Sequence, residues 1–387
     1  DNAEDYWVTM KGEIDSLVKR QTWDIVPRSS CAPNALIVPG TWAFRCKRRP
    51  DGTFRKFKSR WCVRGDIERR INGKNGEVMD TYSPVVQWSS VRLMLVLTII
   101  LGMVTQAVDF SNAFAQADMP EGLDVFLEMP ENFKSSDSSD SVLKLKKSLY
   151  GQTIAPKLWY EKLKKGLENR GFVASKVDPC MFISRKVVIC SYVDDLTIYA
   201  MTQRPIDDLL ESFRNDGDQY NWEMTVEGSV HEFLGINIER NGNKWKMTQT
   251  GLINNVLKAT NMTNCNAKDS PTESDGQPLG SHKNSRPAKE DWSYSSVVGM
   301  LLYLASNSRP DISFAVHQCA RFTHNPREIH EKALLRICRY LKGTLHDGLI
   351  YEPSEEINVD CYCDADFAAL HGIEASDDPN SAKSRTG

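Results

Sequence analysis

Residues 188–199 read Val-Ile-Cys-Ser-Tyr-Val-Asp-Asp-Leu-Thr-Ile-Tyr, and the rest of the chain is interpreted around this stretch. Two runs rich in Val, Ile and Tyr, which favour β-strands, flank two adjacent acids. Only a tight turn fits between the runs, so the pattern predicts a β-hairpin with Asp194 and Asp195 at its tip. A divalent cation such as Mg²⁺ would relieve the repulsion between the two carboxylates. The alternative is an ordinary Asp-Asp turn in solvent, since Asp is common in turns.

The composition is that of a globular protein with more than one lobe. The chain has 387 residues, of which 41% are hydrophobic and 26% charged, and this length favours two or three lobes. No apolar run reaches the roughly 20 residues that span a bilayer. The acidic N-terminus argues against a signal peptide and, without an initiating Met, suggests a piece of a longer protein. The ten cysteines include no Cys-x-x-Cys pair, which predicts reduced thiols in an intracellular protein without a zinc site.

Basic residues gather in two segments although the net charge is −3. Residues 45–74 contain twelve Lys or Arg against three acids, and residues 144–170 contain eight against two. Local basic surface beside an acidic metal centre suits a nucleic-acid channel. The alternative is that each cluster is an ordinary solvated face.

A third acid and a basic hairpin complete the candidate chemistry. Residues 104–110 read as a strand with Asp109 near its end, and one such carboxylate with two at a hairpin tip is the pattern of two-metal phosphoryl transfer. We expect Asp109 and Asp194 to be the principal metal ligands and Asp195 to be secondary. Residues 41–63 predict a second hairpin, with Lys58 and Arg60 on one face, where they would contact phosphate.

The remaining elements are predicted from the periodicity of apolar residues and from the turn-forming residues between them. We expect further strands near 22–26, 125–129, 232–238, 245–247 and 357–367, and a linker at 265–290. Helices are expected at 6–20, 91–101 (capped by Ser89 and Ser90), 155–169, 205–213, 250–259, 294–306, 310–322 and 326–342.

Several short blocks beyond the hairpin make the chain recognisable. Tyr192-Val193-Asp194-Asp195 resembles the polymerase signature of reverse transcriptases. Further blocks occur in the order found in copia-type LTR retrotransposon Pol polyproteins, which the chain resembles from about residue 5 onward: 108–114 (VDFSNAF), 147–151 (KSLYG), 155–160 (APKLWY), 178–180 (DPC), 233–236 (FLGI), 309–312 (RPDI) and 339–343 (RYLKG). A lone Val-Asp-Asp is a weak signal, whereas this ordered series is specific.

The resemblance implies an α+β, right-hand polymerase fold with fingers, palm and thumb. On this reading residues 1–264 form the reverse transcriptase fingers, palm and thumb, and 265–290 the linker. Residues 291–350, which follow the linker, form a helical connection segment, with thumb-side support as the alternative. Residues 357–387 would be the incomplete start of a ribonuclease H-like domain, with Asp364 as its first metal ligand. The later ribonuclease H carboxylates do not follow, so no RNA cleavage is expected from this chain alone.

The resemblance also assigns roles to individual residues. Asp109, Asp194 and Asp195 match the metal-binding catalytic acids. Lys58 and Arg60 match the finger cations that contact the incoming triphosphate. Phe114 matches the bulky residue under the sugar, where a ring would exclude a 2′-hydroxyl; ordinary core packing is its alternative. Phe233, Leu234 and Gly235 match the element that grips the primer end, and a nearby His231 is a weaker candidate proton donor.

One position departs from the family pattern. Where the family carries a polar residue before Ala-Pro, this chain has Ile154. We expect Gln152 to substitute as the nucleotide contact; alternatively, this copy is impaired.

The implied activity is RNA-directed DNA polymerase, with two Mg²⁺ ions as cofactors. Its partners would be an RNA template, a DNA or RNA primer, deoxynucleoside triphosphates and other Pol segments, with no membrane. The implied location is a cytoplasmic particle or the nucleus. The alternatives are an inactive remnant that only binds nucleic acid and another palm-type enzyme such as a nucleotide cyclase. The basic hairpin and the primer-grip-like residues would be unnecessary in a cyclase.

Overall fold

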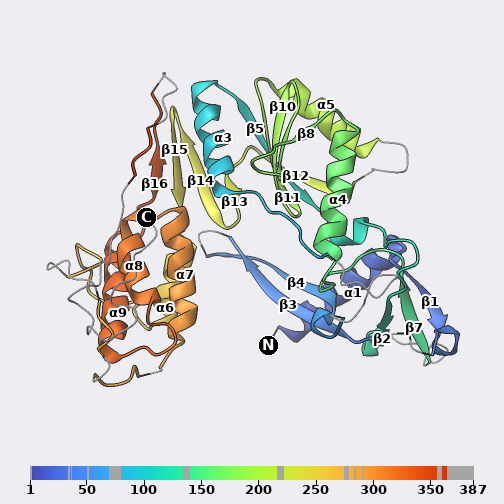
Figure 1. Cartoon of the computed structure of the whole chain (residues 1–387), viewed down its shortest axis with the longest axis horizontal. Coiled ribbons are helices and arrows are strands. Elements are labelled where there is room, and N and C mark those ends of the chain that lie inside the picture. Colours follow the sequence, from blue (N-terminus) through green and yellow to red (C-terminus); the bar gives the residue numbers. More distant parts are fainter. Residues whose placement is uncertain are drawn as a thin grey trace. The chain divides into compact units, whose positions relative to one another are not determined.

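The computed structural model has two compact units. The first consists of Asp1–Arg48 and Phe54–Val230, and the second of Arg49–Thr53 and His231–Gly387 (Figure 1). The structure describes residues 2–33, 35, 37–49, 52–68, 80–133, 140–215, 222–273, 279–282, 285–289, 291–354 and 360–363.

A six-stranded antiparallel sheet forms the centre of the first unit, in the order β12-β5-β11-β10-β9-β8. Its strands are β5 (Val104–Phe110), β8 (Val173–Ala174), β9 (Met181–Ile183), β10 (Val187–Tyr192), β11 (Asp195–Ala200) and β12 (Met224–Gly228). Its helices are α3 (Trp88–Ile100), α4 (Ala155–Glu168) and α5 (Gln203–Arg214). The apolar sides of α4 and α5 pack on the sheet, where Trp159 and Phe213 contact Phe110. This buried layer makes the sheet a rigid platform for whatever its strand ends carry.

A second layer of the first unit joins the N-terminal helix to a long hairpin and a small sheet. The helices are α1 (Ala3–Lys19) and the short α2 (Gly65–Glu68), and the hairpin is β3 (Gly40–Arg48) with β4 (Phe54–Val63). The small sheet has the order β1-β7-β6-β2, from β1 (Trp23–Pro27), β2 (Ile37–Val38), β6 (Phe126–Glu128) and β7 (Ser141–Leu145). Leu17, Trp61 and Leu143 come from these three parts and share one core. The base of the hairpin is therefore anchored in this core.

In its described residues, the second unit packs four helices beside a four-stranded antiparallel sheet. The strands, in the order β13-β14-β15-β16, are β13 (Glu232–Phe233), β14 (Ile236–Asn241), β15 (Lys244–Thr248) and β16 (Leu349–Tyr351). The helices are α6 (Thr250–Ala259), α7 (Tyr294–Asn307), α8 (Ser313–Ala320) and α9 (Glu328–Gly343). Short 3₁₀ segments are η1 (Arg28–Ser30), η2 (Ala113–Gln116) and η3 (Glu131–Phe133) in the first unit and η5 (Pro310–Ile312) in the second. All four helices contribute to one apolar core.

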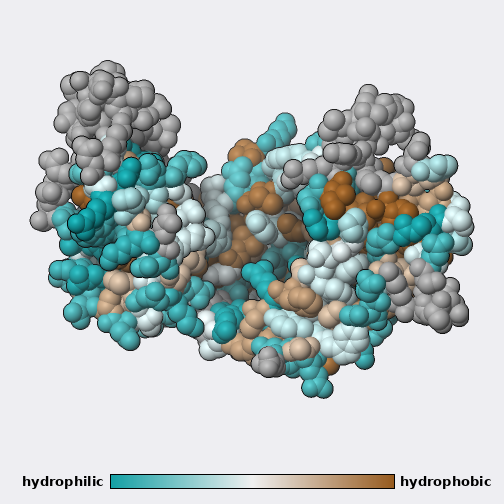
Figure 2. All heavy atoms as spheres, turned by 90° about the horizontal axis from the view of Figure 1, so that it is seen from below, coloured by the Kyte–Doolittle hydropathy of each residue, from teal (hydrophilic) through white to brown (hydrophobic). Residues whose placement is uncertain are grey.

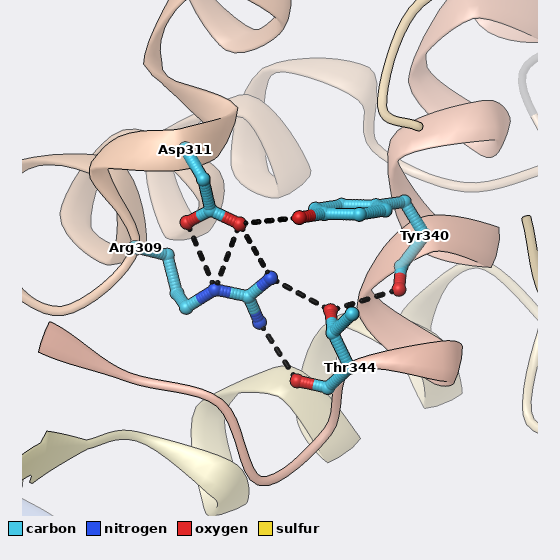
Figure 3. A network of polar contacts seen from close by, with 4 residues as sticks. All are labelled: Arg309, Asp311, Tyr340 and Thr344. Carbon is cyan, nitrogen blue, oxygen red and sulfur yellow. Dashed lines mark hydrogen bonds and ion pairs between the residues drawn. The ribbon is translucent and has the colours of Figure 1, made fainter. Parts of the chain in front are cut away.

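An ion-pair network around the buried Arg309 links two segments of the second unit (Figure 3). Arg309, only 1% exposed, pairs with Asp311 at 2.7 Å and donates to the Thr344 carbonyl at 2.9 Å. The Tyr340 hydroxyl donates to the same Asp311 carboxylate at 2.8 Å. A buried guanidinium is tolerated when its donors are paired, so this network ties η5 to the end of α9, from which the chain leads to β16.

The compact units divide the chain differently from the predicted boundaries. We expected residues 1–264 to separate from the helices of 291–350, but α6 shares its core with α7, α8 and α9, and the division falls after Val230. The described part of the linker also lies against α9, because Arg336 donates to the Thr272 carbonyl at 2.8 Å and Arg339 to that of Asn266 at 2.7 Å. Most of the ribonuclease H-like start, including Asp364, lies outside the described residues.

The other predicted elements agree with the structure to within a few residues, and the mixed helix and strand content is as expected. The α3 cap is an exception. The helix begins at Trp88, and the Asp178 carboxylate accepts the Gln87 N–H and the Ser90 hydroxyl at 2.9 and 2.6 Å. Ser90 thus lies inside the first turn as a donor and does not cap it.

No helix in the part of the chain that the structure describes has the length and apolarity needed to cross a membrane. Hydrophilic side chains cover much of the left-hand lobe in Figure 2, with smaller apolar patches among them.

Candidate active site

Two of the three predicted acids are direct partners across neighbouring strands. Asp195, the first residue of β11, pairs with Asp109 near the end of β5. Val193 and Asp194 form the two-residue turn between β10 and β11, because Tyr192 pairs with Asp195. Directly opposed residues of this kind have Cβ atoms about 5 Å apart. The fold thus brings together carboxylates that are 86 residues apart in the sequence.

The turn that carries Asp194 is strained and clamped. Val193 has a φ of 54°, which a β-branched residue adopts only at a cost. The Trp159 indole N–H donates to the Val193 carbonyl at 2.6 Å, and the Phe110 N–H donates to the Asp194 carbonyl at 2.8 Å. Both turn carbonyls are therefore bonded from other elements, which orients the Asp194 backbone.

The acids repel one another. Burial, together with the charges of Asp194 and Asp109, raises the pKa of Asp195 to about 7. Burial and the charge of Asp194 also raise the pKa of Asp109. Repulsion of this kind favours a bound cation or a proton.

The three carboxylates suit a hard cation whose remaining ligands are water or substrate oxygens. Among the described residues, no group of three or more His, Cys, Asp or Glu is arranged to hold a metal ion, so the acids form no closed cage. Mg²⁺ commonly uses one or two carboxylates together with waters and substrate phosphates. Asp109 with Asp194 or Asp195 fits that requirement by oxygen chemistry and by mutual repulsion.

The basic hairpin places Arg60 beside these acids. The Arg60 guanidinium lies 4.0 Å from the centre of the Tyr150 ring and donates to the Tyr150 hydroxyl at 3.2 Å. Its Nη2 atom is 4.0 Å from Asp194 Oδ2. Lys58 lies two residues earlier on the same strand face. Burial, with the charges of Arg60 and Lys47, lowers the pKa of Lys58 to about 8.

The base of the hairpin is docked by backbone contacts. The Val63 N–H donates to the Tyr150 carbonyl at 2.8 Å. A Cβ atom on Gly65 would lie 2.0 Å from the Gly151 carbonyl oxygen, and one on Gly151 would lie 2.1 Å from that of Val63. Both positions need glycine because the two backbones cross there.

Helix α1 supports the hairpin from behind. Thr9 and Ser59 share a 2.6 Å hydrogen bond, and the Tyr6 ring packs on Phe57. Glu13 is buried in this layer, and burial raises the pKa of its carboxyl, with Lys58 among its charged neighbours.

Phe114 and Tyr150 form an aromatic pair next to Arg60. Their ring centres are 4.9 Å apart in an edge-to-face arrangement. Phe114 is half-buried and packs in part on the sheet core, so some of its ring serves the core packing that was its alternative. Sequence reasoning missed Tyr150, although it stands in the Leu149-Tyr150-Gly151 block that helped to mark the family resemblance.

Gln152 does not reach this cluster. Its side chain is 3% exposed; its oxygen accepts the Leu149 N–H at 2.7 Å, and its nitrogen donates to Glu68 at 3.1 Å. These contacts give Gln152 a structural role, and its contact with the nucleotide stays a prediction. Ile154 is also buried, just before α4.

The predicted primer-grip residues belong to the second unit. Leu234 and Gly235 form the turn between β13 and β14, with φ angles of 51° and 75°. Phe233 is buried and Gly235 is exposed, so the tip presents backbone. His231 is exposed, and its carbonyl accepts the Ile238 N–H at 2.8 Å.

Residues 20–274 match the family profile described as "Reverse transcriptase (RNA-dependent DNA polymerase)". The chain belongs to the reverse transcriptase family. The match includes all three acids and the basic hairpin. It ends before α7, α8 and α9.

This reverse transcriptase chain is similar in sequence to retrotransposon Pol polyproteins, and this similarity confirms the copia-type resemblance. It is 31% identical over 364 residues to the Retrovirus-related Pol polyprotein from transposon RE1 of Arabidopsis thaliana, covering 93% of this chain and 24% of that protein. It is 30% identical over 372 residues to the corresponding polyprotein from transposon TNT 1-94 of Nicotiana tabacum, covering 93% and 27%. The chain thus spans about a quarter of the length of these relatives.

One similar solved structure is that of the foamy viral protease-reverse transcriptase in complex with double-stranded DNA. Its sequence is 13% identical, the TM-score is 0.45, and the match covers 87% of this chain and 48% of that one.

Proposed function

We propose that this chain is an RNA-directed DNA polymerase of a copia-type retrotransposon. It extends a DNA or RNA primer on an RNA template with deoxynucleoside triphosphates, alongside other Pol segments in a cytoplasmic particle or the nucleus. The observation that carries the proposal is the pairing of Asp109 with Asp195 beside the clamped Asp194 turn, with Arg60 next to it. An ordinary solvent-exposed Asp-Asp turn needs neither the third acid nor the adjacent cation.

In this proposal Asp109 and Asp194 hold two Mg²⁺ ions, and the half-buried Asp195 supports them as the secondary acid. When bound, such ions activate the primer 3′-hydroxyl and stabilise the leaving pyrophosphate. Full right-hand architecture, with fingers, palm and thumb, is part of the same proposal.

Lys58 and Arg60 bind the triphosphate. Arg60 is shared between Tyr150 and Asp194 in the described structure, so it exchanges its contact with Asp194 for a phosphate oxygen, a strong charge-assisted partner. The Tyr150 ring keeps the guanidinium oriented during this exchange.

Phe114 lies under the sugar and excludes a 2′-hydroxyl, with its edge-to-face contact to Tyr150 holding the ring in place. Phe233, Leu234 and Gly235 hold the primer end through the exposed turn backbone.

Primer extension tests the proposal. We expect the chain to extend oligo(dT) on poly(rA) with Mg²⁺, and Asp194→Asn to lower kcat by about 1,000-fold or more, equivalent to about 4 kcal/mol. Asp208→Asn on α5, an exposed acid outside the site, is the matched control and should extend normally. Mg²⁺ should raise the melting temperature of the parent and of Asp208→Asn, and raise it less for Asp194→Asn.

Two outcomes would contradict the proposal. Duplex binding without any extension by the parent would favour the nucleic-acid-binding remnant. Full extension by Asp194→Asn would remove that residue from the site.

A further inference from the structure

The Leu234–Gly235 turn is energetically costly as a local structure. Both residues have positive φ angles, as in a type I′ hairpin turn, where Asn-Gly is the preferred sequence. Leu at the first position adopts the left-handed conformation at a cost of about 1–2 kcal/mol. A strained turn of this kind persists when its surroundings hold it.

Helix α7 stabilises this turn through a hydrogen bond. The Tyr303 hydroxyl donates to the Leu234 carbonyl at 2.8 Å. The bond reaches across 69 residues of sequence, and Tyr303 lies beyond the segment that matches the family profile. It therefore connects the expected connection segment to the predicted primer grip inside one compact unit.

The position of Tyr303 is itself fixed relative to the sheet. The buried Asn307 side chain donates to the Tyr303 carbonyl at 2.9 Å. At the end of the same helix, the Ser308 hydroxyl donates to Gln249 at 2.7 Å, and both residues are buried. Gln249 directly follows β15, so the end of α7 is tied to the sheet that carries the turn.

We propose that Tyr303 is a positioning residue for primer binding, which it serves by orienting the Leu234 carbonyl and thereby the exposed Gly235 backbone. This inference rests on the proposed function. Because the peptide between them is trans, the Gly235 N–H points away from the Leu234 carbonyl, so the bond to Tyr303 sets the direction of this exposed donor. A backbone donor of this kind contacts a nucleic-acid phosphate without reading its sequence.

The test compares two tyrosines on one helix. Tyr303→Phe removes the hydroxyl that bonds the turn. Tyr294→Phe removes a hydroxyl that donates to the Cys319 carbonyl at 3.0 Å inside the helical core, and is the matched control. Both are made in the parent and in the Asp194→Asn background. A fluorescent primer–template duplex reports binding by anisotropy without nucleotide, and extension assays report processivity and the KM for nucleotide.

We expect Tyr303→Phe to weaken duplex binding about three- to tenfold, the range for one lost hydrogen bond, in both backgrounds. Processivity should fall with it, while the nucleotide KM and the melting temperature stay at parental values. Tyr294→Phe should lower the melting temperature and leave duplex binding unchanged.

The inference is overturned if Tyr303→Phe binds duplex like the parent, if Tyr294→Phe weakens binding as much, or if the parent binds no duplex. A parent that binds duplex without extending it contradicts the proposed polymerase alone, because the binding comparison in the Asp194→Asn background needs no catalysis.

Discussion

Two hairpin turns, Val193–Asp194 and Leu234–Gly235, differ in how each is held. Each begins with an aliphatic residue at a positive φ, 54° for Val193 and 51° for Leu234. The first turn is bonded at both carbonyls from β5 and from the buried Trp159. The second is bonded through the partly exposed Tyr303 hydroxyl. The proposed chemical turn is thus built into a core, whereas the proposed gripping turn is held at the surface, where it adjusts at lower cost.

Removing the hydrogen bond from the Trp159 indole to the Val193 carbonyl should have the largest effect on activity and stability. Trp159→Phe loses the bond to the Val193 carbonyl and leaves a cavity in the core. We expect kcat to fall about 10- to 100-fold and the free energy of unfolding to fall by about 2–4 kcal/mol. Urea denaturation and single-turnover extension measure the two effects. A drop in stability with kcat intact would mean that the clamp serves folding only.

Raising the pH should weaken nucleotide binding near the first turn and leave duplex binding at the second turn unchanged. The Lys58 pKa of about 8 means that its charge is lost as the pH rises through that value. We therefore expect the KM for nucleotide to rise about three- to tenfold between pH 7 and pH 9, the effect of losing one charge-assisted contact. The affinity for the primer duplex should stay constant.

The matched control for this pH effect is Lys58→Arg, because a guanidinium stays protonated throughout the range. A rise of the same size in the arginine variant would assign the pH effect to another group.

Replacing each strained residue by glycine would relieve the backbone strain at that turn. In Val193→Gly and Leu234→Gly, relief of the left-handed conformation offsets the lost side-chain packing and the added chain entropy. We expect the free energy of unfolding to change by less than about 1 kcal/mol in each. Val193→Gly should lower kcat, and Leu234→Gly should weaken duplex binding. Denaturation, extension and anisotropy check the three effects, and reversed functional effects would contradict the assigned roles.

Acidification should have the smallest effect. It should lower the stability of the second unit and raise that of the first. His330 is buried, accepts the Arg327 N–H at Nδ1 and contacts the Gly280 carbonyl through Nε2, and burial lowers its pKa. The unfolded state then binds the proton more readily, so the second unit loses stability as the pH falls below about 6.5.

The pKa of Asp195 is raised instead, so protonation relieves the repulsion in the first unit, and the resulting stability is lost as the pH rises through about 7. Limited proteolysis at pH 5 and pH 7.5 should cut the second unit sooner at the lower pH. His330→Asn, which cannot take up a proton, should remove that difference.

Much of the local structure was predictable because side-chain periodicity reports it directly. The acid hairpin, the basic hairpin and the helices agree with the predicted ranges to within a few residues. The errors concern contacts between distant segments. We expected Ser89 and Ser90 to cap α3, but the helix begins at Trp88, and Asp178 accepts hydrogen bonds from Gln87 and Ser90. The apparent linker is bonded to α9 because Arg336 and Arg339 reach its carbonyls. Composition carries no signal for bonds of this kind.

The amino-acid sequence alone specified which residues carry the acids and cations and which strands present them, because β alternation and turn chemistry are local properties. The folded chain was needed to establish that Asp195 faces Asp109, that the Trp159 indole bonds the Val193 carbonyl and that Tyr150 contacts Arg60. Register between distant strands and the direction of a buried side chain depend on the packing of the whole core, and short-range patterns do not encode that packing.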